Sequence, residues 1–286
     1  MPFNTGLSNE MLINHLDDPN WLVLDCRFDL ADTDWGFTNY QLGHIPGAVY
    51  VHLNDDLSGQ ITPETGRHPL PEPGEFAKKL AYWGIVPGKQ VIVYDQGGGS
   101  FAGRLWWMLR AIGHDSAALL DGGLPKWMND NHPLSKGVEF PRSHNSTLPD
   151  ISFNPHLWVK TEEVINFIHN PHKLLIDARA PERFSGEIEP IDSIAGHIPG
   201  AINRFNGLDL NPNGTFKSPE VLREEFLALL NGIPPENTII YCGSGVTSCH
   251  LLAAMEMAGL KGARLYAGSW SEWIRDPGRP LEQQLV

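Results

Sequence analysis

The most informative stretch of this chain is a short apolar run that leads into a cysteine and a glycine-containing loop: Thr238-Ile239-Ile240-Tyr241-Cys242-Gly243-Ser244-Gly245-Val246-Thr247-Ser248. The apolar run predicts a buried strand. Beyond the loop, hydrophobic residues recur at helical spacing as far as Gly259, which predicts a helix that ends there. Cys242 therefore stands at the tip of a strand, where backbone N–H groups and the positive end of a helix dipole favour thiolate over thiol. Because the thiolate is the nucleophilic form, we expect covalent chemistry at Cys242.

The chain repeats itself once. Four segments of the first half return in the second half in the same order: residues 22–27 with 174–179, 43–48 with 196–201, 91–95 with 238–242, and 121–127 with 267–273. A repeat of this length indicates two homologous domains rather than a solenoid. We expect an N-terminal domain over residues 1–139, a polar, proline-containing linker over 140–152 and a C-terminal domain over 153–286.

Each half alternates short apolar runs with helical patterns. Ser218, Pro219 and Glu220 supply a cap, a first-turn proline and a first-turn acid, and so predict a helix that ends at Gly232. The matching helix of the first half is expected to end at Gly84. This alternation predicts an α/β fold in which each domain is a mostly parallel sheet flanked by helices on both faces. Ligands bind at the carboxyl ends of such strands, which is where Cys242 is placed.

Composition excludes several classes of function. The 286 residues suit about two domains, and a formal net charge of −13 disfavours binding to nucleic acid or to anionic membranes. No apolar stretch is long enough to span a membrane, and the layout of a signal peptide is absent. Three cysteines, an odd number without framework spacing, indicate a reducing, cytoplasmic location. No Cys-x-x-Cys pair is present, and we expect neither a metal site nor a cofactor.

The two halves differ at the residue that would do the chemistry. Asp95 stands in the first repeat where the second has Cys242, and an aspartate cannot act as a thiolate. We therefore expect only the C-terminal domain to be catalytic. Across essentially the whole chain, the repeated Asp-x-Arg and Gly-His-Ile-Pro-Gly-Ala segments and the strand–cysteine–loop–helix pattern resemble the tandem-domain rhodanese superfamily of sulfurtransferases. The loop from Cys242 to Thr247 is similar to that of the mercaptopyruvate sulfurtransferase branch.

The resemblance implies a reaction. Cys242 would take a sulfane sulfur from a small anionic donor, become a persulfide, and pass the sulfur to a thioredoxin-like protein, a low-molecular-weight thiol or cyanide. Arg183 would bind the anionic group of the donor. The neutral pair Gly243 and Ser244 favours 3-mercaptopyruvate over thiosulfate. The persulfide would be surrounded by the backbone N–H groups of the loop Gly243, Ser244, Gly245, Val246 and Thr247.

Several residues have a second interpretation. The Ser244 hydroxyl either binds the donor or caps its own loop. Gly243 and Gly245 are expected to provide backbone conformations closed to other residues. Arg179 and His197 have counterparts in the half without the cysteine, so a structural role is expected for both. The histidines are scattered along the chain, and most are predicted to be surface or packing residues.

One departure from the resemblance affects donor binding. Ile191 stands near the place where mercaptopyruvate relatives bring a second arginine, and Arg67 or Arg104 could compensate. A cysteine phosphatase would need an arginine six residues after the nucleophile, where this chain has Ser248. Two alternatives stay open: a thiosulfate:cyanide sulfurtransferase, and a persulfide carrier or regulatory module with little turnover.

Overall fold

The computed structural model describes residues 3–141, 147–148 and 150–283. Its contacts divide the chain into two compact units. Unit 1 comprises Met1–Gly59, Pro71–Asn154 and Leu210–Phe216, and unit 2 comprises Gln60–Leu70, Pro155–Asp209 and Lys217–Val286. A segment of the first half of the sequence, residues 60–70, thus packs with unit 2. Part of the expected linker over 140–152 lies outside the described residues.

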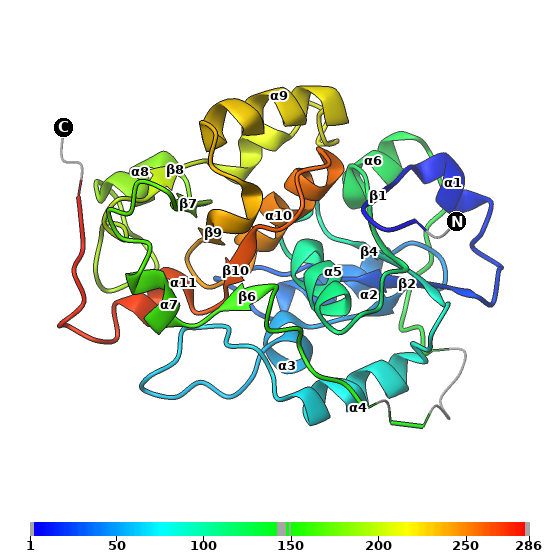
Figure 1. Ribbon diagram of the computed structural model, residues 1–286. Coiled ribbons are helices and arrows are strands. Elements are labelled where there is room, and N and C mark those ends of the chain that lie inside the picture. Colours follow the sequence, from blue (N-terminus) through cyan, green and yellow to red (C-terminus); the bar gives the residue numbers. More distant parts are fainter. Residues whose placement is uncertain (1–2, 142–146, 149, 284–286) are drawn as a thin grey trace. The chain divides into compact units, whose positions relative to one another are not determined.

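Each unit is built on a parallel five-stranded sheet (Figure 1). The sheet of unit 1 has the order β1-β5-β4-β2-β3, with β1 at Gly6–Leu7, β2 at Trp21–Asp25, β3 at Val49–Tyr50, β4 at Gln90–Tyr94 and β5 at Ala117–Leu120. The sheet of unit 2 has the order β6-β10-β9-β7-β8, with β6 at Trp158–Val159, β7 at Leu174–Asp177, β8 at Ile202–Asn203, β9 at Thr238–Tyr241 and β10 at Arg264–Tyr266. The two orders are the same once the strands are renumbered within each unit. The predicted α/β fold of two similar domains is therefore confirmed.

Helices connect these strands. In unit 1 they are α1 (Asn9–Ile13), α2 (Trp35–Leu42), α3 (Leu53–Leu57), α4 (Pro73–Trp83), α5 (Ala102–Ala111) and α6 (Gly123–Asn129). In unit 2 they are α7 (Thr161–Ile165), α8 (Pro181–Ser185), α9 (Pro219–Leu230), α10 (Thr247–Met257) and α11 (Ser269–Trp273), with short 3-10 turns η1 (Asn206–Asp209) and η2 (Pro235–Asn237). None of the helices in the described part of the chain has the length and apolar character that crossing a membrane requires.

The helix boundaries follow the signals in the sequence. The Ser218 hydroxyl caps α9 by accepting a hydrogen bond from the Val221 N–H, and α9 ends at Asn231 in a left-handed conformation, one residue before Gly232. Gly84, at a φ of 71°, ends α4 in the same way. Beyond α10, Gly259 also has a φ of 71°. The cap at Ser218 and the end of α4 at Gly84 are confirmed, whereas α9 and α10 are capped by Asn231 and Ala258, each one residue before the glycine predicted to end the helix.

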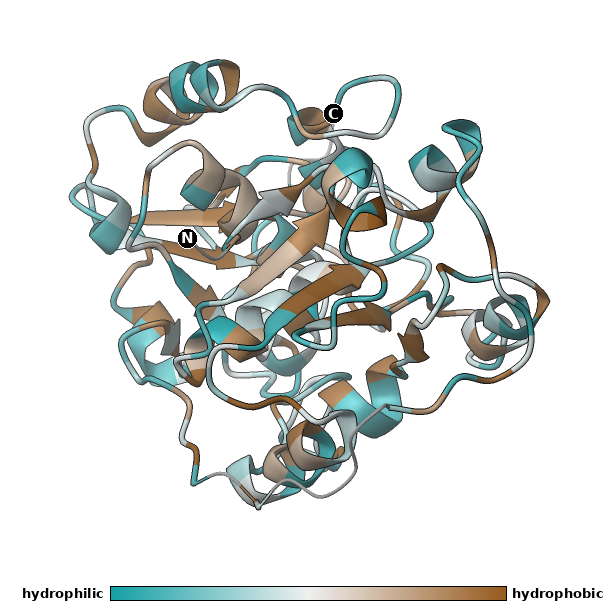
Figure 2. Cartoon of the chain, turned by 90° about the vertical axis from the view of Figure 1, so that its right-hand side faces the viewer, coloured by the Kyte–Doolittle hydropathy of each residue, from teal (hydrophilic) through white to brown (hydrophobic). Residues whose placement is uncertain are grey.

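The core of unit 2 fixes the strand that precedes Cys242. Ile239 and Tyr241 belong to a buried cluster with Phe184, Trp270 and Trp273, whereas Ile240 points to the opposite face of the sheet because side chains alternate along a strand. α10 packs against β9 and β10. Apolar residues on both faces give the strands their largely brown colour in Figure 2, while the helices mix brown and teal. Burial of each large aliphatic side chain contributes about 1.5–3 kcal/mol, so β9 is held firmly in place.

The repeated segments form matching structural contacts. Arg179 donates two-pronged hydrogen bonds to Asp177 and one of 2.6 Å to the Gly196 carbonyl; Arg27 binds Asp25 and Gly43 in the same pattern in unit 1. The predicted Asp–Arg pairing is confirmed in both units. The histidines of the repeat are equally structural, because Nδ1 of His197 lies 2.7 Å from the Phe184 carbonyl and Nδ1 of His44 lies 2.8 Å from that of Tyr40.

Candidate active site

Cys242 follows β9 directly and precedes the loop that leads into α10. Its side chain is almost fully buried, with 2% of its surface exposed. Gly245 takes a φ of +75°, and a Cβ there would collide with the Ala267 carbonyl. The glycine expected for its conformational freedom is therefore required at this position. Its neighbour Val246 is buried, and Thr247 is the first residue of α10.

The start of α11 anchors the backbone of Cys242. The Ser269 hydroxyl accepts a hydrogen bond of 3.1 Å from the Cys242 N–H and donates one of 2.9 Å to the Tyr266 carbonyl. Ser269 has a φ of 55°, a conformation that suits glycine, and the aligned residue of unit 1, Gly123, has the same φ of 55°. The Trp270 N–H donates to the Cys242 carbonyl at 3.0 Å. A strained serine is thus kept where its hydroxyl holds the reactive residue.

The surroundings of Cys242 favour its thiolate. Burial acts to raise the pKa of the thiol, but hydrogen bonds from the Ser248 hydroxyl and from the backbone N–H groups of Ser244 and Ser248 outweigh it, and the pKa is lowered. Cys26 shows the opposite outcome. Burial, with the nearby carboxylates of Asp25 and Asp95, raises the pKa of the Cys26 thiol well above its ordinary value.

Ser248 is a residue whose role sequence reasoning missed, because its position served only to exclude a phosphatase. It lies in the first turn of α10 and is fully buried. Its hydroxyl is one of the groups that lower the pKa of the Cys242 thiol.

Replacing Ser248 by alanine should move the titration of Cys242 to higher pH. The thiolate loses a hydrogen-bond donor while the burial that opposes ionisation stays, so less thiolate is present at neutral pH. We expect the rate of alkylation by iodoacetamide at pH 7 to fall about fivefold, since one such hydrogen bond is worth about 1 kcal/mol. Ser185→Ala, on α8, should leave the profile unchanged. An unaltered pH profile in Ser248→Ala would remove this role from the hydroxyl.

Two guanidinium groups lie over Gly243. A Cβ built on this glycine would stand 2.9 Å from Nη2 of Arg67 and 3.4 Å from Nη2 of Arg183. Gly243 is not among the residues with positive φ, so the conformational reason expected for this glycine is wrong. Its lack of a side chain makes room for two cations instead.

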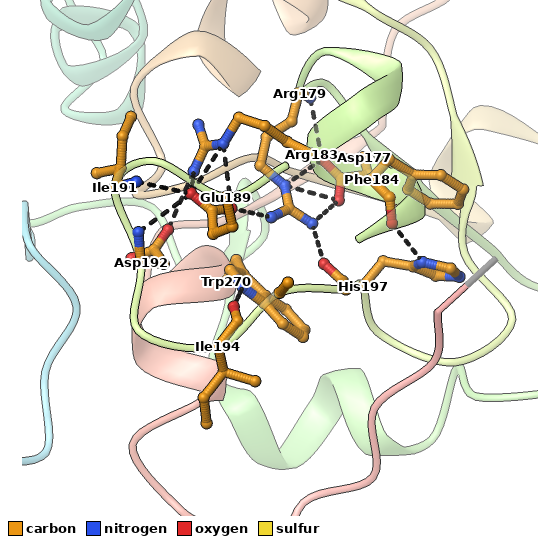
Figure 3. Close-up of polar contacts among 12 residues, drawn as sticks. Asp177, Arg179, Arg183, Phe184, Glu189, Ile191, Asp192, Ile194, His197 and Trp270 are labelled. Atoms are coloured by element: carbon orange, nitrogen blue, oxygen red, sulfur yellow. Dashed lines mark hydrogen bonds and ion pairs between the residues drawn. The ribbon is translucent and has the colours of Figure 1, made fainter. Parts of the chain in front are cut away.

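Buried carboxylates hold Arg183, whose contacts with Glu189 and Asp192 are drawn in Figure 3, and one of them, Asp192, also holds Arg67. Arg183 donates to Glu189 at 2.8 Å and to Asp192 at 3.1 Å, and Arg67 forms an ion pair with the other oxygen of Asp192. Glu189 also accepts a hydrogen bond of 3.1 Å from Arg179. Arg183 thus pairs with buried acids rather than with its exposed neighbours, and 17% of its side chain remains exposed. Charged groups linked in this way keep both guanidiniums in fixed positions beside Gly243.

His68 contacts the loop directly. Its Nδ1 lies 2.7 Å from the Ser244 hydroxyl, and both residues are buried, with 5% of their surface exposed. The expectation that the histidines are mostly surface or packing residues is wrong for His68. The 176 positions between the two residues left no local signal that could have paired them.

The remaining candidates lie elsewhere. Ile191 has 42% of its surface exposed, and its N–H donates to Glu189. Arg104 is a buried residue of α5 in unit 1. Of the two arginines that could compensate for Ile191, Arg67 is therefore the one beside Gly243. Among the described residues, no group of three His, Cys, Asp or Glu side chains is arranged to hold a metal ion.

The loop of unit 1 shows what this loop geometry binds. Asp95 replaces the cysteine, and its carboxylate accepts four backbone hydrogen bonds of 2.9–3.1 Å, from Gly97, Gly99, Phe101 and Ala102. Successive N–H groups that converge in this way form a site for an anion. In unit 1 the side chain of the aspartate fills that site.

Comparisons with known proteins place the chain in one family. A model of the rhodanese-like domain matches residues 8–130 and 160–276. The chain therefore belongs to the rhodanese-like family and carries two such domains. The crystal structure of SseA from Escherichia coli, a 3-mercaptopyruvate sulfotransferase, superposes with a TM-score of 0.78 at 33% identity and covers 94% of this chain and all of that one.

The sequence relatives narrow the class. A probable 3-mercaptopyruvate sulfurtransferase of Pseudomonas aeruginosa is 46% identical over 96% of each chain. A putative thiosulfate sulfurtransferase of Mycobacterium tuberculosis, SseB, is 39% identical over 91% of this chain and 89% of that one. The chain is a tandem rhodanese sulfurtransferase of the branch that includes the 3-mercaptopyruvate enzymes.

Proposed function

We propose that this protein transfers sulfur from 3-mercaptopyruvate to a thiol through a persulfide on Cys242. The observation that carries the proposal is the position of Cys242: a buried cysteine with a lowered thiol pKa in a loop flanked by two arginines. Arg183 and Arg67 would bind the donor carboxylate, and the N–H groups from Gly243 to Thr247 would hold the persulfide. Unit 1 would be non-catalytic, since Asp95 fills the matching site. The proposed domain limits are 1–139 and 153–286.

In the first step the Cys242 thiolate attacks the thiol sulfur of the donor. The new S–S bond forms as the C–S bond breaks, and the bonding electrons leave with the carbon as the enolate of pyruvate, which a proton from solvent converts to pyruvate. Negative charge develops on the keto oxygen. The Ser244 hydroxyl, paired with His68 at 2.7 Å, would donate to that oxygen.

In the second step an acceptor thiolate attacks the outer sulfur. The acceptor becomes a persulfide and Cys242 returns as a thiolate, so no net oxidation occurs and the kinetics should be ping-pong. We propose a thioredoxin-like protein or a low-molecular-weight thiol as acceptor, with cyanide as a laboratory substitute. The three cysteines are free, which suits a reducing cytoplasm.

Thiosulfate is the second candidate donor. The Mycobacterium tuberculosis relative bears that activity in its name, and the two arginines beside Gly243 supply cations that the loop itself lacks. The carboxylates of Glu189 and Asp192 reduce the net positive charge, however, and for that reason we favour the singly charged carboxylate of mercaptopyruvate.

Measurement of kcat/KM for both donors, with one thiol acceptor, tests the proposal. We expect mercaptopyruvate to be used at least about tenfold better, a difference of about 1.4 kcal/mol in transition-state binding. A clear preference for thiosulfate would refute the choice of donor. A protein that gains one sulfur atom by intact-mass analysis but never turns over with any thiol would be a persulfide carrier.

A further inference from the structure

We propose that Asp192 sets the charge selectivity of the donor site. Its carboxylate bridges Arg67 and Arg183, and its negative charge shifts the preference of the site from doubly charged toward singly charged donors. This inference rests on the proposed function, in which these arginines bind the donor. It concerns a residue of the loop after α8 whose side chain bonds to the two arginines rather than to Cys242 or its loop.

The bridge leaves both arginines able to bind a donor. Asp192 engages Nη1 of Arg67 and Nη2 of Arg183. Among the described residues, Nη2 of Arg67 and Nη1 of Arg183 make no hydrogen bond to the protein, and both lie near Gly243. A donor carboxylate can therefore use these groups without displacing Asp192.

Charge then decides which anion the site prefers. The two guanidiniums are matched by two carboxylates, Asp192 and Glu189, both almost fully buried. These acids repel the second negative charge of a dianion. The surroundings are partly desolvated, so the repulsion energy between two unit charges at close range is far larger than in water. A monoanion avoids most of that repulsion.

Of the two carboxylates, Asp192 is the one whose charge can be removed with less effect on the fold. Glu189 also binds Arg179 and accepts the backbone N–H groups of Ile191 and Asp192, so its charge is part of the fold. The Asp192 carboxylate, by contrast, binds the two arginines beside Gly243. Neutralising Asp192 should thus add one positive charge to the donor site at little structural cost elsewhere.

The test compares donors in charge-changing variants. In Asp192→Asn, the ratio of kcat/KM for thiosulfate to kcat/KM for mercaptopyruvate should rise about tenfold relative to the wild type. Asp192→Glu keeps the charge and should keep the ratio. Glu163→Gln, at the exposed ion pair with Arg264, changes the net charge of the chain equally and should also leave the ratio unchanged. A ratio that stays constant or falls in Asp192→Asn overturns the inference.

A measurement on the wild type guards against a variant that does not fold. Pyruvate, a monoanion, should inhibit sulfur loading at lower concentration than malonate, a dianion of similar size. Stronger inhibition by malonate would also overturn the inference. A wild type that prefers thiosulfate would refute the proposed donor. The role of Asp192 would still be tested in that case, because the change of the ratio in Asp192→Asn can be measured from any starting value.

Discussion

Replacement of Cys242 by serine is expected to abolish sulfur transfer from both mercaptopyruvate and thiosulfate. A serine hydroxyl stays protonated at neutral pH and forms no persulfide, so the covalent route is lost and kcat should fall by at least about 10⁴-fold. Pyruvate release under multiple turnover measures the rate. Intact-mass analysis after incubation with donor alone should show the gain of one sulfur atom in the wild type and none in Cys242→Ser.

Two other cysteines provide matched controls. Cys26 is buried beside Asp25, and its thiol pKa is raised, so it should be unreactive. Cys249 is fully buried, and its thiol donates to the Gly245 carbonyl at 3.3 Å. Cys26→Ser should keep sulfur loading. Sulfur loading that persists in Cys242→Ser and disappears in Cys249→Ser would show that Cys249, and not Cys242, is the nucleophile.

The repeat made the fold predictable from sequence. Strand β9 and helix α10 carry local signals, namely an apolar run, a helical period and a closing Gly259, and local signals are what sequence patterns encode. The Asp-x-Arg pairing could be judged structural because it also occurs in the half with Asp95. The same comparison of halves predicted that only one loop carries a nucleophile.

The donor site could be predicted only in part. Arg183 lies close in sequence to a repeated segment, but Arg67 and His68 come from residues 60–70, which pack with unit 2 although they belong to the first half of the sequence. Contacts such as that of Arg67 with Asp192, 125 positions away, leave no periodicity or spacing to detect. Gly243 shows a second limit, because a glycine required for space looks the same in sequence as one required for its φ.

The loop of unit 1 strengthens the assignment of the loop after Cys242. Asp95 and Cys242 occupy equivalent positions, and the buried Asp95 carboxyl group accepts hydrogen bonds from four backbone N–H donors. Burial raises the pKa of Asp95, and the four N–H groups oppose that rise. The same fold therefore gathers backbone N–H donors at this place in a unit that cannot form a persulfide.

Replacement of Arg183 by glutamine should weaken mercaptopyruvate binding more than any other single change outside Cys242. Glutamine removes one of the two cations beside Gly243, while Glu189 keeps its ion pair with Arg179. Charge-assisted hydrogen bonds are worth about 1.5–3 kcal/mol, so kcat/KM should fall about 10- to 150-fold, chiefly through KM. Steady-state kinetics with mercaptopyruvate as the varied donor would measure the effect.

The split between KM and kcat separates donor binding from a structural role. If Arg183 only stabilised the fold through Glu189 and Asp192, the variant would melt at lower temperature but its folded fraction would keep the wild-type KM. Arg183→Lys retains the charge without the planar, two-pronged geometry and should give an intermediate KM. Arg264→Gln, which breaks the exposed pair with Glu163, removes the same charge and should change neither constant. A wild-type KM in Arg183→Gln would show that the donor carboxylate is bound elsewhere, and Arg67 would then be the cation to test.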